Sequence, residues 1–167
     1  SRTQLMFLIE HSKTSYYVRK YCEGHKDVID INIPGYRNFT ALSFAVHSNQ
    51  NLNVTRYLCS SFKDTIDMTV IDKKNNNLLM LATRSNINEE IVKYLCDNFK
   101  DIYDINYKDQ FGNTAFLLAA TYNENIAVID YLCQTYKDVI DPYVENDFGQ
   151  NAFMLSARNL SVEMMKY

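Results

Sequence analysis

The cysteines and histidines are the side chains in this 167-residue sequence that could supply a nucleophile, a base or a soft metal ligand. Cys22 and His25 are close enough in sequence to be considered as a nucleophile and its base. The same cysteine position recurs, however, at Cys59, Cys96 and Cys133, with 37 residues between successive members. A residue shared by every unit of a repeat indicates packing, and a buried thiol is unreactive. We therefore expect packing rather than catalysis from Cys22.

The acidic residues do not predict a metal or phosphate-transfer site. Asp147-Phe148-Gly149 matches the magnesium motif of kinases, but neither a Gly-rich loop nor a catalytic-loop motif accompanies it. Pairs such as Asp64 and Asp67 lack the alternating carboxylates of a calcium loop and are explained as turn and cap residues. The three histidines have no zinc-ligand spacing. We expect no enzyme activity, no catalytic residue, no metal and no cofactor.

Composition and charge exclude further classes. The sequence is 47% hydrophobic and 22% charged, as globular proteins are. A net charge of -3 and a longest basic run of only Lys73-Lys74 argue against nucleic-acid binding. No apolar run approaches the roughly 18 residues that span a bilayer, and no signal peptide is recognisable. We expect an intracellular, cytoplasmic protein that is monomeric, located in the host cytosol if its source is a virus or an intracellular bacterium.

The elements that position these side chains form a repeat. Each cysteine is followed at constant spacing by a Lys-Asp pair, at Lys26-Asp27, Lys63-Asp64, Lys100-Asp101 and Lys137-Asp138. A fixed period between 20 and 50 residues is typical of a solenoid, in which each unit buries its apolar face against its neighbours. Units stacked about 10 Å apart place equivalent cysteines beyond the reach of a disulfide, which needs Cα atoms within about 7 Å. We therefore expect a column of buried, unpaired thiols.

Two columns of capping residues divide each unit into two helices. A side-chain oxygen at a helix N-cap accepts a hydrogen bond from the first turn, so the columns mark predicted helix starts. The first column precedes an apolar inner helix and the second precedes an outer helix with apolar residues at i, i+3 and i+4. The first column is Thr3, Thr40, Asn77, Thr114 and Asn151, and the second is Thr14, Asn51, Asn88 and Asn125.

Extended segments connect each outer helix to the next inner helix, at residues 27–39, 64–76, 101–113 and 138–150. Their Asp, Asn, Pro and Gly content predicts turns. We expect one domain over residues 1–167, with units at 3–39, 40–76, 77–113 and 114–150 and a partial unit at 151–167, about four and a half repeats. Since neither end offers a polar capping unit, we also expect a fragment of a longer array.

These units resemble ankyrin repeats. Gly112 to Ala120 is similar to the family's Gly-x-Thr-Pro-Leu-His-x-Ala-Ala, and Ile91 to Cys96 is similar to its Ile-Val-x-Leu-Leu-Leu. The resemblance implies a mainly α, curved helix-turn-helix solenoid with hairpin loops and a concave face. Where the family has histidine in the inner helix, this chain has Ser43, Met80, Leu117 and Met154, so we expect apolar packing to replace the histidine hydrogen bonds. A solenoid of plain helix pairs is the rival, although the 13-residue connections are long for one.

The resemblance also implies where a partner binds, because ankyrin proteins bind through hairpin tips and the exposed side of the inner helices. Aromatic and arginine side chains dominate binding energy at such surfaces. The alternative for Phe111 and Phe148 is that they pack on adjacent hairpins. The candidate residues are Tyr36, Arg37, His47, Lys73, Lys74, Arg84, Gln110, Phe111, Tyr122, Asp147, Phe148 and Arg158.

A protein-binding module without catalysis is the function that we expect, with a protein as the partner and no binding to nucleic acid or membranes. One alternative is a scaffold segment of a larger enzyme or host-directed effector whose catalytic domain lies outside this chain. A second alternative is a structural spacer in a long array, which predicts no partner of high affinity.

Overall fold

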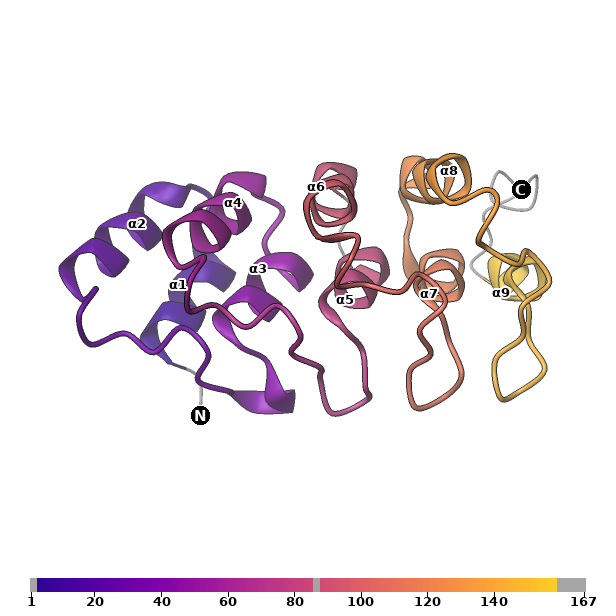
Figure 1. Ribbon diagram of the computed structural model, residues 1–167, viewed down its shortest axis with the longest axis horizontal. Helices are drawn as coiled ribbons and strands as arrows, with labels where there is room; N and C mark the ends of the chain where they lie inside the picture. The colour runs from indigo at the N-terminus through magenta and orange to yellow at the C-terminus, as the bar shows by residue number, and fades with distance from the viewer. Residues whose placement is uncertain (1–2, 86–87, 159–167) are drawn as a thin grey trace.

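Two parallel rows of helices make up the protein (Figure 1). The computed structural model describes residues 3–85 and 88–158, and these form nine α-helices and one 3-10 helix, Tyr36–Asn38. The inner row is α1 (Gln4–His11), α3 (Ala41–His47), α5 (Leu78–Ser85), α7 (Ala115–Tyr122) and α9 (Ala152–Arg158). The outer row is α2 (Ser15–Gly24), α4 (Leu52–Ser61), α6 (Glu89–Phe99) and α8 (Ile126–Thr135). The predicted helical solenoid is confirmed.

Every predicted cap of an inner helix is present. The Thr40 hydroxyl accepts from the Ser43 amide at 3.3 Å, and the Asn77 side chain accepts from the Met80 amide at 2.9 Å. The side-chain oxygens of Thr3, Thr114 and Asn151 likewise accept a hydrogen bond from the amide three residues later in the chain. In the outer row the caps at Asn51, Asn88 and Asn125 are also present. Thr14 also precedes its helix, α2, as predicted, but its side chain makes no capping hydrogen bond.

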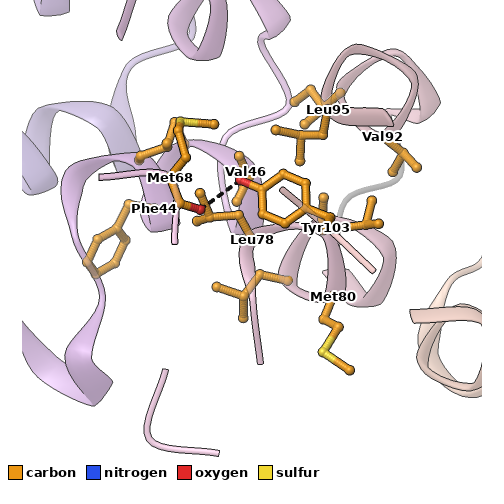
Figure 2. Close-up of a cluster of buried hydrophobic side chains, with 14 of the residues drawn as sticks. Phe44, Val46, Met68, Leu78, Met80, Val92, Leu95 and Tyr103 are labelled. Carbon is orange, nitrogen blue, oxygen red and sulfur yellow. Dashed lines mark hydrogen bonds between the residues drawn. The ribbon is translucent and has the colours of Figure 1, made fainter. Parts of the chain in front are cut away.

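Apolar side chains fill the space between the rows and between successive units. Figure 2 shows one junction, where Val46 and Leu78 of the inner row meet Leu95 of the outer row. Tyr103, from the segment after α6, enters this core and donates its hydroxyl to the Met68 carbonyl at 2.9 Å (Figure 2). Burying apolar surface from neighbouring units supplies the stability that no single unit could provide.

Asparagine side chains also join the units, which the sequence did not predict. Of the residues that replace histidine, Met80 and Leu117 are buried as expected, whereas Met154 is 49% exposed. In addition, Asn49 donates to the Ile9 and Ser12 carbonyls of the preceding unit. Asn123 donates to the Thr83 carbonyl at 2.7 Å, and its own oxygen accepts from an amide at the start of α8. The expectation of purely apolar junctions was therefore incomplete.

The outer face carries a second repeated contact. Burial raises the thiol pKa of Cys22, Cys59 and Cys96 to about 11, so these cysteines are protonated packing residues, as predicted. Tyrosines of the following outer helices lie under cations of the preceding helices. These pairs are Tyr57 under Arg19, Tyr94 under Arg56 and Tyr131 under Lys93. Cys133 is only half-buried.

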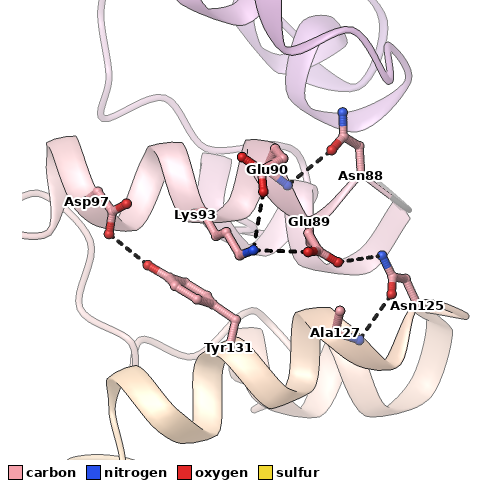
Figure 3. Close-up of polar contacts among 8 residues, drawn as sticks. All are labelled: Asn88, Glu89, Glu90, Lys93, Asp97, Asn125, Ala127 and Tyr131. Atoms are coloured by element: carbon pink, nitrogen blue, oxygen red, sulfur yellow. Dashed lines mark hydrogen bonds and ion pairs between the residues drawn. The ribbon is translucent and has the colours of Figure 1, made fainter.

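Polar contacts between α6 and α8 are shown in Figure 3. Lys93 binds Glu89 and Glu90 on its own helix at 3.0 and 3.2 Å. Across the junction, Asn125 donates to Glu89 and the Tyr131 hydroxyl donates to Asp97 at 2.9 Å (Figure 3). Since exposed ion pairs contribute little stability, these contacts orient the outer row rather than hold it together.

Candidate partner-binding site

The hairpins project from the inner row on the side away from the outer helices (Figure 1). Three of them are organised by an Asp or Asn side chain at their base. The Asp72 carboxylate accepts from the Lys74 and Asn76 amides at 2.7 and 2.8 Å. Asp109 and Asn146 bind the equivalent amides of their own hairpins. Because this interaction fixes the backbone of each tip, the tip side chains are held in a regular series.

Main-chain hydrogen bonds connect the tips of successive hairpins. The Lys73 amide donates to the Arg37 carbonyl at 3.1 Å, and the Gln110 amide donates to the Lys74 carbonyl at 3.0 Å. The Asp147 amide donates to the Phe111 carbonyl at 3.0 Å. The tips therefore form one continuous edge beside the inner helices. We call the surface between this edge and the inner helices the concave face.

A basic recess of about 310 Å³ lies on the concave face between the first three hairpins and helices α3 and α5. The buried side chains of Phe39 and Leu81 form part of its lining. The recess brings together half of the residues that the sequence predicted for the site. These are Arg37, His47, Lys73, Lys74, Arg84 and Gln110.

The charges around the basic recess do not balance. Four cations line it, and its one carboxylate, Asp72, is already bound to the amides of its own hairpin. Within residues 3–85 and 88–157, whose side chains the structure describes, none of the four cations forms an ion pair. Burial, Arg84 and Arg37 together lower the pKa of His47, against the opposing charges of Asp72 and Glu10. The recess is consequently a site of positive potential.

An aromatic recess of about 480 Å³ follows on the same face. It is lined by Phe111, Tyr122 and Phe148, together with the buried Leu155. The rings of Phe111 and Phe148 lie 6.2 Å apart with an interplanar angle of 31°, so they do pack on adjacent hairpins. Phe148 is nevertheless 68% exposed and Tyr122 is 52% exposed. Contact between the rings therefore leaves apolar surface accessible to a ligand.

Two cation–aromatic contacts connect the recesses. The Arg84 guanidinium lies 4.6 Å from the ring centroid of Tyr122, and the Lys74 ammonium lies 5.7 Å from that of Phe111. In both pairs the cation lines the basic recess and the ring lines the aromatic recess. The two recesses are thus adjacent parts of one surface.

Three predicted residues lie outside the recesses. Tyr36 is 64% exposed and contacts Arg37 at 5.4 Å from its ring centroid, but it lines neither recess. Asp147 packs against Gly112 instead. Arg158 is the last residue of α9, and its side chain lies outside the described part of the chain.

Sequence reasoning missed several lining residues. Asp72 and Asn146 had a usable signal, because together with Asp109 they occupy equivalent positions of three successive units and Asp is typical of such a turn. Phe39, Leu81 and Leu155 carry no sequence signal that separates them from ordinary core residues. They were therefore indistinguishable from the rest of the apolar interior.

Comparison with known proteins agrees with this architecture. A family model described as ankyrin repeats, in three copies, matches residues 5–106. No curated protein matches the chain. The chain belongs to the ankyrin-repeat family, whose members are generally protein–protein interaction modules.

Among the described residues, no group of three or more His, Cys, Asp or Glu could hold a metal ion. No helix of the described segments is long and apolar enough to cross a membrane.

Proposed function

We propose that this chain binds a partner protein through its concave face and has no catalytic activity of its own. The observation that carries the proposal is the continuous surface made by the basic and aromatic recesses. Apart from Phe111 and Phe148, which are equivalent residues of successive hairpins, the candidate residues on this surface differ between units, whereas the capping and cysteine positions that repeat serve folding. Exposed aromatic and arginine side chains at its centre are the types that contribute most to protein binding.

The surroundings of Cys22 and His25, the pair that could suggest an enzyme, support the proposal that the chain has no catalytic activity. Burial raises the pKa of the Cys22 thiol to about 11, whereas a nucleophilic cysteine needs a lowered pKa. His25 donates its Nδ1–H to the Tyr21 carbonyl at 2.8 Å and stacks on the Tyr21 ring. Neither residue has the environment of a nucleophile activated by a base.

The test begins with a partner captured from a lysate of the source cells and then purified. Its affinity is measured by calorimetry for the wild-type chain and for a Phe111→Ala/Phe148→Ala variant. We expect the variant to bind at least about tenfold more weakly, because two ring contacts are lost. The matched control is Tyr16→Ala/Tyr17→Ala, a pair of exposed rings in contact on α2 of the outer row.

Hydrogen exchange on the same complex supplies an independent readout. Protection of the hairpin tips and inner helices supports the proposal. Unchanged affinity in the Phe111→Ala/Phe148→Ala variant, or protection confined to the outer helices, contradicts it. Circular dichroism melting of both variants verifies that the array remains folded.

A further inference from the structure

We infer that the segment bound by the concave face is an acidic peptide, with a carboxylate in the basic recess and a neighbouring aromatic or aliphatic side chain in the aromatic recess. The inference rests on the proposed function and specifies the chemistry of the partner.

Charge complementarity is the first argument. The chain as a whole carries a net charge of -3, yet the basic recess gathers four cations around a single carboxylate that is engaged by backbone amides. Like charges held together in a recess raise the free energy of the unbound protein, and a bound anion removes that repulsion. The pKa of His47 in the recess is lowered first by burial and then by the charges of Arg84 and Arg37, so these two cations also oppose a further positive charge there.

The construction of the recess favours a carboxylate over a diffuse negative charge. Arg37 comes from the first hairpin, Lys73 and Lys74 come from the second, and Arg84 comes from the last turn of α5, so the cations converge from three elements. Arg84 is held over the Tyr122 ring, which orients its planar guanidinium. Oriented guanidinium groups bind carboxylates through two parallel hydrogen bonds. The buried Phe39 and Leu81 beside them reduce water competition for those bonds.

The adjacent aromatic recess indicates which kind of peptide side chain lies next to the carboxylate. Phe111, Tyr122 and Phe148 present apolar rings beyond the Arg84–Tyr122 and Lys74–Phe111 contacts. At the boundary of the two recesses, Lys74 and Phe111 occupy equivalent positions of neighbouring hairpins, and neighbouring units are about 10 Å apart, which is the length of about three residues of extended chain. The matching peptide therefore has an acidic and an apolar residue about three positions apart.

A nucleic acid is the less favoured ligand. A phosphate backbone is matched by a long basic stripe, whereas these cations are confined to one recess and are followed on the same face by apolar rings. Tighter binding of an oligonucleotide than of the peptide is therefore a result that would contradict the inference.

The experiment uses fluorescein-labelled synthetic peptides and fluorescence polarisation with the full 167-residue chain. The probe GSEEAAFLG is compared with GSQQAAFLG, which lacks the charge, and with GSEEAAAAG, which lacks the apolar pair. We expect each change to weaken binding at least about fivefold, and binding of the probe to weaken as sodium chloride rises from about 50 to about 300 mM. A single-stranded oligonucleotide of mixed sequence is titrated in parallel.

Protein variants locate the site. Arg84→Gln and Lys74→Gln are expected to weaken probe binding about three- to tenfold each, while Lys63→Gln, which removes an exposed charge outside the recess, leaves it unchanged. The inference is overturned if the probe does not bind, if the glutamine peptide binds equally well, if the oligonucleotide binds more tightly, or if Lys63→Gln has the larger effect.

Failure of this inference is distinguishable from failure of the proposed function. If the captured partner protects the concave face in hydrogen exchange while the probe fails to bind, a protein-binding face remains and the acidic chemistry is wrong. If the partner protects only the outer row, both are wrong.

Discussion

A Cβ atom on Gly112 would lie 2.4 Å from Oδ1 of Asp147 in the following hairpin. Gly112 is at the tip of its hairpin with a φ of +74°, and Gly149 occupies the equivalent position of the next hairpin with a φ of +69°. Around Gly149 nothing lies within 4 Å of such a Cβ. The two glycines therefore have the same backbone conformation, and only Gly112 is covered by another hairpin.

Alanine at these two positions should have unequal effects. Gly149→Ala is expected to cost about 1 kcal/mol, the ordinary penalty of a side chain at positive φ. Gly112→Ala is expected to cost at least about 1 kcal/mol more, because Asp147 must move. Urea unfolding of both variants measures the difference. Equal losses would contradict the close packing of these hairpins.

Replacing Asn123 should loosen the junction between α5 and α7. Asn123→Ala removes the bond to the Thr83 carbonyl and the acceptor for the Asn125 amide, leaving buried polar groups unsatisfied. We expect a loss of about 2–3 kcal/mol in the free energy of unfolding. Asn106→Ala is the matched control, since Asn106 makes an equivalent inter-unit bond to Val139 but is exposed. A similar loss in the two variants would sink the idea that burial sets the cost.

Alkaline pH should destabilise the fold through the cysteine column. The thiol pKa of Cys59 is about 11 in the folded protein against an ordinary 9.0, because burial opposes the thiolate. A raised folded pKa means that the folded state keeps its proton while the unfolded chain loses it. This contribution to stability is present below about pH 9 and is lost as pH rises towards 11. Cys59→Ala should flatten the decline in unfolding free energy over that interval, and an unchanged slope would refute the assignment.

Acidification should destabilise the fold through His47. Its folded pKa lies below the ordinary 6.5, so the unfolded chain takes up the proton first and stability falls as pH drops below about 6.5. Arg84→Gln removes one of the two cations that oppose protonation, while Asp72 and Glu10 remain to favour it. The pKa of His47 should therefore rise in that variant. NMR titration of the imidazole C–H resonance measures it, and an unmoved pKa would show that Arg84 does not act on His47.

A large part of the fold was predictable because it depends on local chemistry repeated at a fixed interval. Thr40 and Asn77 are caps by residue type and by the apolar runs that follow them. The bonds of Asn49 and Asn123 to preceding units were not predictable. Their acceptors are backbone carbonyls, which every residue possesses, so no partner residue marks the contact in the sequence.

Part of the candidate site was predictable, because the register of the repeat assigns residues of successive units to the same surface of the array. The family pattern implied that Arg37 and Lys74 lie at hairpin tips and Arg84 on the exposed side of an inner helix, but it did not predict that they converge on one basic recess. Tyr36 does not line this recess, because Gly35 replaces the Asp or Asn found at the base of later hairpins. The first hairpin instead forms a 3-10 helix in which Arg37 has a φ of +62°. Periodicity assigns a residue to a tip but not the direction of its side chain.

The bonds between hairpin tips involve only amides and carbonyls. Every amino acid except proline supplies both groups, so exchange of the side chains at Lys73, Lys74, Gln110 and Phe111 leaves these bonds between hairpins in place, whereas Gly112 is restricted by Asp147. Proline alone is forbidden at Lys73, Gln110 and Asp147, whose amides are donors. If the proposed function holds, we expect substitutions at these tips to change the bound partner without disturbing the backbone bonds that join the hairpins.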